Sequence, residues 1–466
     1  MFFALLKREI LDNLQSARFT IIFVMCSLLV LLSLAIGAHD YGVAKKQYEV
    51  SSSQMQEMAR QQVTYQALGV WGLFRVYRPP SALLPFAKGL EQSSGTNTTV
   101  SVVQEPKLQD SLDSVEPIYA QFNTLDFHFV VRVVVALFAL MLSFDLINGE
   151  RDAGTLKLVL SHPVPRTQFI LAKLAGAWSS LLLPLLLPIL IGVLAIAAFV
   201  DLPWRGEEWA RIGLMLMASI IYLGLFVALG VWVSSCIQRP SNALLILVLI
   251  WLSFVWVLPR VSLYVATQAT RLPALHEVER DKWEIDRQWY RDSVAVQQQW
   301  LSEHRDQTEV PVDVQTKLLG ALQNDVKKKK ARIDEEYTAR TRERNQWVVW
   351  LARLSPAAAF ENVMLALSST HLERQEQFLA EVKQYRNSFS RYVGERMNQE
   401  MRDMQQGTGA VGARGLDLAG MPQFTAPRPQ LAQDLQRIAP DLAVLLAYLV
   451  VACLLSYWTF LNYRVV

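Results

Sequence analysis

Six long apolar segments, each bounded by polar residues, dominate the hydrophobic pattern of this chain. A helix needs roughly 20 predominantly apolar residues to cross the hydrocarbon core of a bilayer. Runs of this kind predict membrane-spanning helices over residues 18–38, 126–147, 171–200, 211–236, 242–265 and 441–461. The pattern therefore predicts an all-α integral membrane protein with about six transmembrane helices.

The residues before the first span have a helical period of their own. An apolar side chain recurs every four positions, at Phe2, Leu6, Ile10 and Leu14. The charged residues Lys7, Arg8 and Glu9 lie on the opposite side of such a helix. A helix with this pattern lies in the plane of the membrane interface. We therefore expect residues 1–17 to form an uncleaved interfacial helix and not a signal peptide.

Basic residues indicate the orientation, because short cytoplasmic segments are enriched in Lys and Arg. They cluster before the first span, between the second and third spans, between the fourth and fifth, and after the sixth. This distribution predicts that both termini, the segment 148–170 and the tail 462–466 are cytoplasmic. Residues 39–125 and 266–440 are then extracytoplasmic.

The two long extracytoplasmic segments are helical by pattern. Residues 274–346 predict a pair of helices broken near 309–313, and residues 370–405 predict a further helix. The proline-containing stretches RPPSALLPFAKGLE and LSPAAAFENVMLALSSTH are expected to lie flat on the membrane surface. The segment 266–440 is accordingly predicted to be a mainly helical domain.

Sequence motifs for catalysis are absent. The chain contains no G-x-x-x-x-G-K phosphate loop, no H-E-x-x-H pair and no G-x-S-x-G elbow. Its three cysteines lie in or beside predicted spans. We expect no enzymatic activity, no bound metal or cofactor and no nucleic-acid partner. Arg132 is an intramembrane charge in the second span, which indicates either a cavity or a side chain that reaches the interface.

The segment between the second and third spans combines charges with an amphipathic pattern. A short helix is expected to begin near Glu150, whose charge suits a helix N-terminus, and to end at Ser161, Pro163 and Pro165. Its apolar face would consist of Leu156, Val159 and Leu160. Such a helix, tied to two spans, is either a lever for a cytoplasmic partner or an interfacial anchor.

This segment, GERDAGTLKLVLSHPVPRTQFILAKLAG, resembles the corresponding segment of type-2 ABC exporter permeases. The resemblance rests on E-x-x-x-G-T-L, then L-x-L-S-x-P-V-x-R, then a helix with a Lys and a Gly. The layout is also similar, with an N-terminal interfacial helix and six spans. The enlarged loops after spans one and five are similar to those of a bacterial subgroup of these permeases.

The resemblance implies a permease subunit that pairs with a second permease chain, identical or paralogous, in the bacterial inner membrane. Each permease would contact a separate ABC ATPase subunit, giving two ATPase copies that hold ATP and Mg. The coupling element would include Glu150, Gly154, Thr155 and Leu156, with Arg151 and Arg166 as polar contacts. Arg8 and Glu9 would belong to an interfacial elbow.

Three classes of function remain open at this stage. The first is a permease that exports a substrate, and the second is a mechanotransmission device that moves extracytoplasmic helices against a periplasmic partner without cargo. The third is a membrane scaffold or receptor that has no ATPase. The first two need the coupling helix, whereas the third does not.

Overall fold

The computed structural model describes residues 2–70, 74–89, 91, 95–103, 105–106, 125–161, 165–304, 309–405, 416–426 and 428–462. Within these ranges, six helical segments are long and apolar enough to cross a membrane, which confirms the predicted all-α membrane fold. Most of the tail 462–466 and Pro163 lie outside the described residues. The chain divides into two units, residues 1–255 with 356–466, and residues 256–355.

The first unit contains five of the six apolar segments in full and the first part of the segment Pro240–Ala269. They are α2 (Ala17–Arg60), the segment formed by α6 (Phe127–Phe129), η1 (Val130–Val135), α7 (Ala136–Ser143) and α8 (Asn148–Asp152), then α10 (Arg166–Phe199), α11 (Gly206–Cys236), α12 (Pro240–Leu252) and α18 (Leu431–Leu461). The π-helical turn η1 interrupts the second span around Arg132. Two prolines, Pro184 and Pro188, lie inside α10, as the sequence requires.

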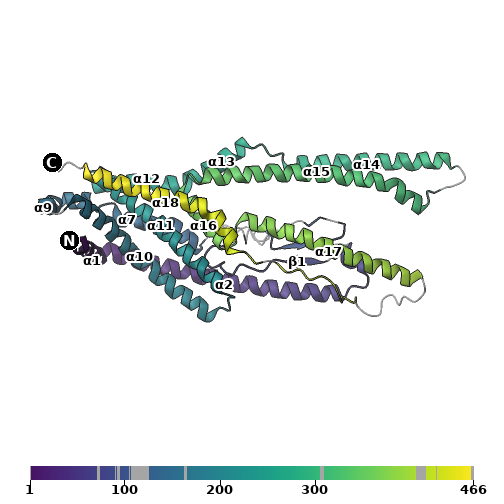
Figure 1. Ribbon diagram of the computed structural model, residues 1–466, viewed down its shortest axis with the longest axis horizontal. Coiled ribbons are helices and arrows are strands. Elements are labelled where there is room, and N and C mark those ends of the chain that lie inside the picture. Colours follow the sequence, from purple (N-terminus) through teal and green to yellow (C-terminus); the bar gives the residue numbers. More distant parts are fainter. Residues whose placement is uncertain are drawn as a thin grey trace. The chain divides into compact units, whose positions relative to one another are not determined.

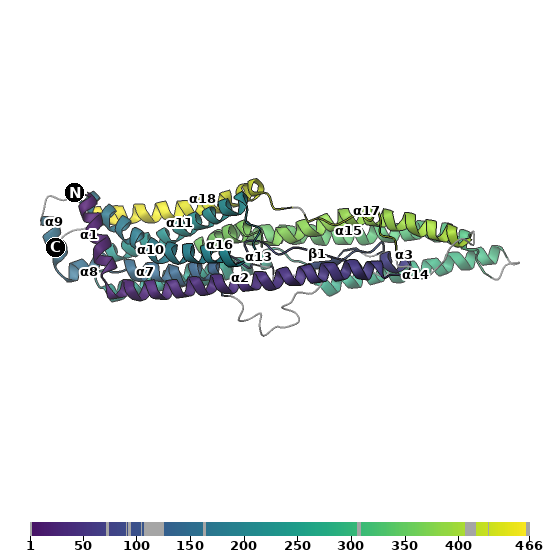
Figure 2. The ribbon, with the colours of Figure 1, turned by 90° about the horizontal axis from the view of Figure 1, so that it is seen from below.

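The two chain ends lie at one end of this unit, together with α1 (Phe2–Leu14) and α9 (Thr155–Ser161) (Figure 1). We call this the terminal end and the opposite end of the bundle the far end. In Figure 2, α1 runs crosswise to the long helices. Helix α1 packs mainly against α10.

The first helix continues well beyond the residue 38 that the hydrophobic pattern gives as its end. Helix α2 runs without a break to Arg60, because the polar residues that follow the apolar run retain helical propensity. Its last turns contribute Met55 and Ala59 to a second apolar core, with Phe378 and Phe389 from α17 (Leu372–Gln405). A short helix, α3 (Tyr65–Gly69), packs against α17 as well.

A two-stranded antiparallel sheet completes this second core. Strands β1 (Arg75–Tyr77) and β2 (Asn97–Thr99) pair with Val76 opposite Thr98. The ring of Phe74 stacks on Phe389 at a centroid distance of 5.3 Å. The far-end segment of α2 is therefore packed by apolar side chains and is not an isolated helix in solvent.

Helix α16 (Pro356–Leu367) is buried, which corrects the expectation that this stretch lies flat on the membrane surface. It packs between α11 and α18, and the ring of Phe360 stacks on Tyr222 of α11 at 4.5 Å. Small residues at its start, Ala357, Ala358 and Ala359, permit this close approach.

The second unit contains the predicted helix pair. Helix α14 (Leu275–Glu303) and helix α15 (Val312–Ala352) are in contact, and α13 (Leu258–Ala269) packs against α15. The break between α14 and α15 falls where Pro311 precedes the first helical residue, as the proline predicted. The chain passes between units within η2 (Ser253–Val257), and again before α16. The segment 266–440 is thus divided at residue 355 and is not one structural unit.

Candidate functional site: a charged joint at the terminal end

The segment after the second span forms two short helices, where the sequence pattern predicted one. Helix α8 ends at Asp152 and α9 begins at Thr155. Gly154 lies between them with φ of 74°, a left-handed conformation that favours glycine and ends helices. The Thr155 hydroxyl donates to the Glu150 carbonyl at 3.1 Å across the break. Gly154 therefore sets the angle between α8 and α9.

In helix α9 the predicted apolar face turns toward the rest of the chain, and an apolar residue outside that face, Leu158, is exposed. Leu156 is only 2% exposed, so it packs within the chain and is not available to a partner. Leu158, which the helical period had placed off the apolar face, is 63% exposed. Val159 is half-buried, and the side chain of Leu160 lies outside the described part. The exposed surface of α9 is thus formed around Thr155, Lys157 and Leu158.

A cluster of three charged side chains joins α8, α1 and α10. The Lys173 ammonium lies 2.5 Å from Glu150 Oε1 of α8 and 2.6 Å from Glu9 Oε2 of α1. The Lys173 and Glu9 side chains are about nine-tenths buried, and Glu150 is about three-quarters buried. We call Glu9, Lys173 and Glu150 the terminal triad. One cation thus connects two helices that the chain places far apart in sequence.

The burial of Glu9 corrects its expected position on the outward face of the interfacial helix. Glu9 is the buried residue of α1, and Gly176 lies directly beneath it. A Cβ atom at Gly176 would come within 2.5 Å of the Glu9 Cγ atom. Burial raises the pKa of the Glu9 carboxyl above its ordinary value, and the Lys173 ammonium opposes this rise. The helix is thus oriented by a carboxylate and not by its apolar stripe alone.

The other predicted elbow residue, Arg8, has a different role. Its Nε atom lies 3.5 Å from Asp12 Oδ2 in an exposed i, i+4 pair, which contributes little to stability. Arg8 therefore belongs to the solvated side of α1, whereas Glu9 belongs to the joint.

Further polar contacts fasten the ends of the same segment. Asn148, at the start of α8, accepts a hydrogen bond from the Ser234 hydroxyl of α11 at 3.1 Å. Arg166, at the start of α10, donates to the Leu461 carbonyl at the end of α18 at 3.1 Å. Arg18 of α2 pairs with Asp145 after α7. Arg151 is half-buried. The segment that carries α9 is consequently attached to four spans.

Arg132, predicted to line a cavity or to reach the interface, has an acidic partner in the structure. Its guanidinium pairs with Glu361 of the buried helix α16, and its carbonyl accepts the Tyr222 hydroxyl at 2.9 Å. This partner could not be predicted from local pattern, because Glu361 lies 229 positions away in a stretch that was expected at the membrane surface. The pair is a structural link at the far side of the second span.

Lys173 is the residue of the joint that pattern analysis did not single out as a site. A signal was present, since a lysine in an apolar helix is costly unless it has a partner. The sequence could not identify two acidic partners, because neither lies at helical spacing from Lys173. In the described ranges, no group of three or more His, Cys, Asp or Glu side chains is placed to hold a metal ion.

The described residues at the terminal end connect an exposed surface to several spans through a short helix, a left-handed glycine and a buried ionic cluster. Together with six apolar helices, these features define a multi-pass membrane protein.

Comparison with known proteins identifies the family. The family described as ABC-2 family transporter protein matches residues 3–464, so the chain belongs to this family of ABC transporter membrane subunits. This confirms the resemblance on which the sequence expectations depended. The chain is similar to a probable ABC transporter permease protein NosY of Stutzerimonas stutzeri, with 32% identity over 130 residues. That match covers 28% of this chain and 47% of the relative.

A second relative gives the same result. The probable ABC transporter permease protein NosY of Pseudomonas aeruginosa is 33% identical over 110 residues, covering 24% of this chain and 40% of the relative. The chain thus matches less than half the length of either curated relative, while the family match extends over nearly all of it.

Proposed function

We propose that this chain is the permease subunit of an ATP-binding-cassette exporter of the bacterial inner membrane, with its terminal end in the cytoplasm. Two permease chains, identical or paralogous, would pair, and each would receive one separate ATPase subunit that holds ATP and Mg. The exposed surface of α9 would dock on that ATPase. The substrate would be exported through the membrane part of the pair.

The contacts of the terminal triad are the main support for this proposal. A displacement of α9 acts on α8, and Glu150 of α8 is bonded through Lys173 to both α10 and α1. In a partly desolvated environment an ion pair is far stronger than on the surface, so these helices move together. The contacts Arg166–Leu461 and Asn148–Ser234 extend the same connection to α18 and α11.

The roles of the predicted coupling residues follow from their exposure. Thr155 and the newly identified Leu158 would touch the ATPase, with Gly154 setting the angle of presentation. Glu150 would act through Lys173 and not by contact, and Leu156 would hold α9 against the chain. Arg151 would be a polar contact to the ATPase on the same short segment.

Co-purification tests the docking surface. The tagged chain is purified in mild detergent from its native membrane, and co-purified proteins are identified and quantified by mass spectrometry. We expect a stoichiometric ATPase subunit with the unmodified chain and its loss with Leu158→Asp. Val103→Asp, at an equally exposed apolar residue (67% against 63%) in the extracytoplasmic part, is the matched control. Equal ATPase recovery with both variants would contradict the docking assignment.

A mechanotransmission complex without cargo is a second candidate, favoured by the continuity of α2. This helix of 44 residues is about 66 Å long at 1.5 Å per residue, about twice the roughly 30 Å hydrocarbon core. Its far segment is packed into the apolar core with α17. A movement at the terminal end is thereby carried to the extracytoplasmic surface.

Spin-label distances separate the two candidates. One nitroxide on the exposed Val50 of α2 (51% exposed) reports the distance between paired chains in lipid nanodiscs. Mechanotransmission predicts a shifted distance distribution when ATP replaces the nucleotide-free state, with no substrate present. Distributions that coincide would reject mechanotransmission and leave the export function.

A further inference from the structure

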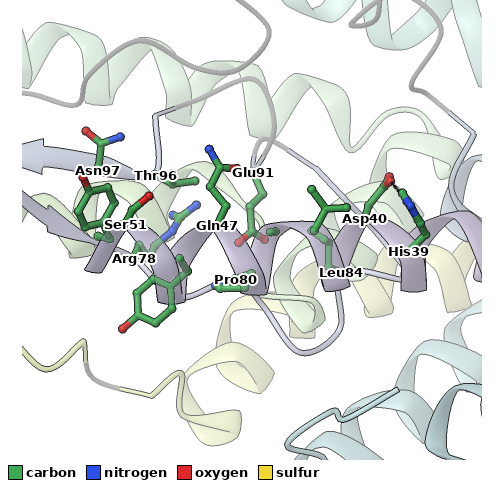
Figure 3. A pocket seen from close by; sticks show the side chains of 14 residues that line it. His39, Asp40, Gln47, Ser51, Arg78, Pro80, Leu84, Glu91, Thr96 and Asn97 are labelled. Carbon is green, nitrogen blue, oxygen red and sulfur yellow. Dashed lines mark hydrogen bonds and ion pairs between the residues drawn. The ribbon is translucent and has the colours of Figure 1, made fainter. Parts of the chain in front are cut away.

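Two cavities in the extracytoplasmic part of the first unit share a wall formed by Arg78, Pro80 and Glu91. The smaller cavity has a volume of about 250 Å³ and lies along α2. In Figure 3, Gln47, Arg78 and Glu91 occupy its middle, between Asn97 at one end and His39 and Asp40 at the other. The larger cavity, of about 720 Å³, reaches the start of α11. Volumes of this order are typical of small-molecule sites.

The shared wall carries two buried charges, and the carboxylate of one of them, Glu91, is incompletely hydrogen-bonded. Arg78 is 7% exposed and Glu91 is 8% exposed. The Ser81 backbone N–H donates to Glu91 Oε1 at 3.1 Å, whereas Oε2 has no hydrogen-bond partner among the described residues. Each of the two charges acts on the other, although no ion pair within 4.0 Å joins them in the part of the chain that the structure describes. A molecule with two opposite charges can therefore engage both.

Burial disfavours the charged form of both groups, and a bound molecule with two opposite charges would counteract this effect. Burial lowers the pKa of the Arg78 guanidinium and raises the pKa of the Glu91 carboxyl. An anion at Arg78 and an ammonium donor at Glu91 Oε2 would each form a charge-assisted hydrogen bond, the stronger kind. They would also compensate two charges that are costly to bury.

The position of the larger cavity favours a lipid headgroup. Glu207, Glu208 and Arg211, at the start of the α11 span, line it. Next to it, the Trp204 indole donates to the Ala82 carbonyl at 3.0 Å and packs edge-on against Trp209. Tryptophan is enriched where spans meet the headgroup layer. These features favour a position at headgroup depth, and Arg205, Arg374 and Arg428 add basic lining that suits a phosphate.

We propose that this wall binds a zwitterionic headgroup of the phosphoethanolamine type, with its phosphate at Arg78 and its primary amine at Glu91. The site belongs to this chain alone and is independent of ATPase coupling, so its test stands or falls separately from the proposed function. The same chemistry is available from phosphatidylethanolamine or from free phosphoethanolamine.

Native mass spectrometry of the full chain tests the site. The chain is released from mixed vesicles of phosphatidylethanolamine and phosphatidylglycerol in equal amounts, and the retained lipids are counted. We expect preferential retention of phosphatidylethanolamine, reduced about tenfold by Arg78→Gln, the effect of losing one charged hydrogen bond. Glu91→Gln, which is isosteric, should bring the ratio of the two lipids to about one while lipid is still retained. The exposed Lys46→Gln on α2 is the control and should change neither value.

A merely structural role of Glu91 would alter the amount of folded protein but not its preference between the two lipids. A change in the lipid ratio therefore indicates that Glu91 takes part in binding. If Arg78→Gln does not fold, the ratio in Glu91→Gln decides alone. Displacement of the lipid by millimolar phosphoethanolamine would show that the headgroup suffices, and persistence of selective binding would assign the lipid as source. Equal retention of both lipids by the unmodified chain, or a ratio unchanged by Glu91→Gln, would overturn the proposal.

Discussion

The two ends of the membrane bundle each contain a buried ionic cluster, and the clusters are built differently. At the terminal end, one ammonium serves two carboxylates, and each link joins two side chains. At the far end, Arg211 of α11 lies 2.6 Å from Asp434 of α18, and both side chains are at least 94% buried. The Arg211 guanidinium also donates to the carbonyls of Leu367 and Pro429 at 3.0 and 3.4 Å.

Because of this difference, we call the terminal triad a joint and the far-end cluster around Arg211 and Asp434 a clamp. The far-end cluster fixes backbone positions of three segments with a guanidinium whose fork geometry restrains them. The terminal triad relies on a lysine, whose compact charge on a flexible stem restrains direction less than a guanidinium fork does. This asymmetry is compatible with the proposed function, in which an ATPase would act on the terminal end.

Removing the cation of the joint is expected to have the largest effect. Lys173→Met leaves two buried carboxylates facing each other, and loss of one member of a buried pair costs roughly 3–5 kcal/mol. We expect the upper end, about 5 kcal/mol, measured as the unfolding free energy in detergent. Adding Glu9→Gln and Glu150→Gln should recover most of the loss. An unchanged stability for Lys173→Met would mean that the triad is not a joint.

Breaking the clamp is expected to cost less. Arg211→Met removes the closer of two cations beside the buried Asp434 carboxylate and leaves Arg437, whose guanidinium lies 3.5 Å from Asp434 Oδ1. We therefore expect the lower end of the range, about 3 kcal/mol, in the same measurement. Arg211→Lys should recover only part of this, because one ammonium cannot replace the fork that reaches two carbonyls and a carboxylate. Full recovery by lysine would remove the distinction between the two ends.

The far end should also be sensitive to pH, through His371. The Arg437 guanidinium donates to His371 Nε2 at 2.6 Å, which requires the neutral imidazole. Burial, helped by Arg437, lowers the pKa of His371 from 6.5 to about 4. Since the unfolded chain binds the proton first, stability is complete above pH 6.5 and falls as pH decreases toward 4.

The expected loss between pH 7 and pH 5 is about 2 kcal/mol. Unfolding at both pH values, with His371→Gln as the control, measures it. The variant should remove this part of the pH dependence. A profile that is identical in both proteins would contradict a neutral His371.

The smallest expected effect concerns the packing of α1 against α10. Gly176→Ala places a methyl group against Glu9 and should cost about 1–2 kcal/mol. Gly213→Ala in α11 is the matched control, because a Cβ atom added at Gly213 would meet no atom within 4 Å. This variant should be neutral or stabilising by up to about 1 kcal/mol. Equal stabilities of the two variants would show that α1 is not held closely on α10.

The sequence predicted the parts of the fold that depend on local pattern. The apolar segments form the helices that can span the membrane, and Pro311 marks the break between α14 and α15. Both follow from periodicity and backbone chemistry within a few residues, which is why they could be read without a structure.

The features that need long-range pairing could not be predicted. Glu9 looked like part of a solvated face, because its partner Lys173 belongs to another helix. Leu156 and Leu158 differ in exposure because residues two positions apart lie on opposite sides of α9. The break at the left-handed Gly154, which the spacing did not reveal, separates α9 from α8. Helix α16 is buried because α11 and α18 flank it, which could not be predicted from the single proline and the alanines at its start.

Photo-crosslinking at the exposed position of α9 tests the central claim most directly. The photoreactive residue p-benzoylphenylalanine replaces Leu158 in one protein and Val103 in another, and native membranes are irradiated. We predict a crosslink from position 158 to an ABC ATPase subunit and none from position 103. A crosslink to the ATPase from neither position, with both proteins correctly inserted, would contradict the assignment of α9 as the coupling surface.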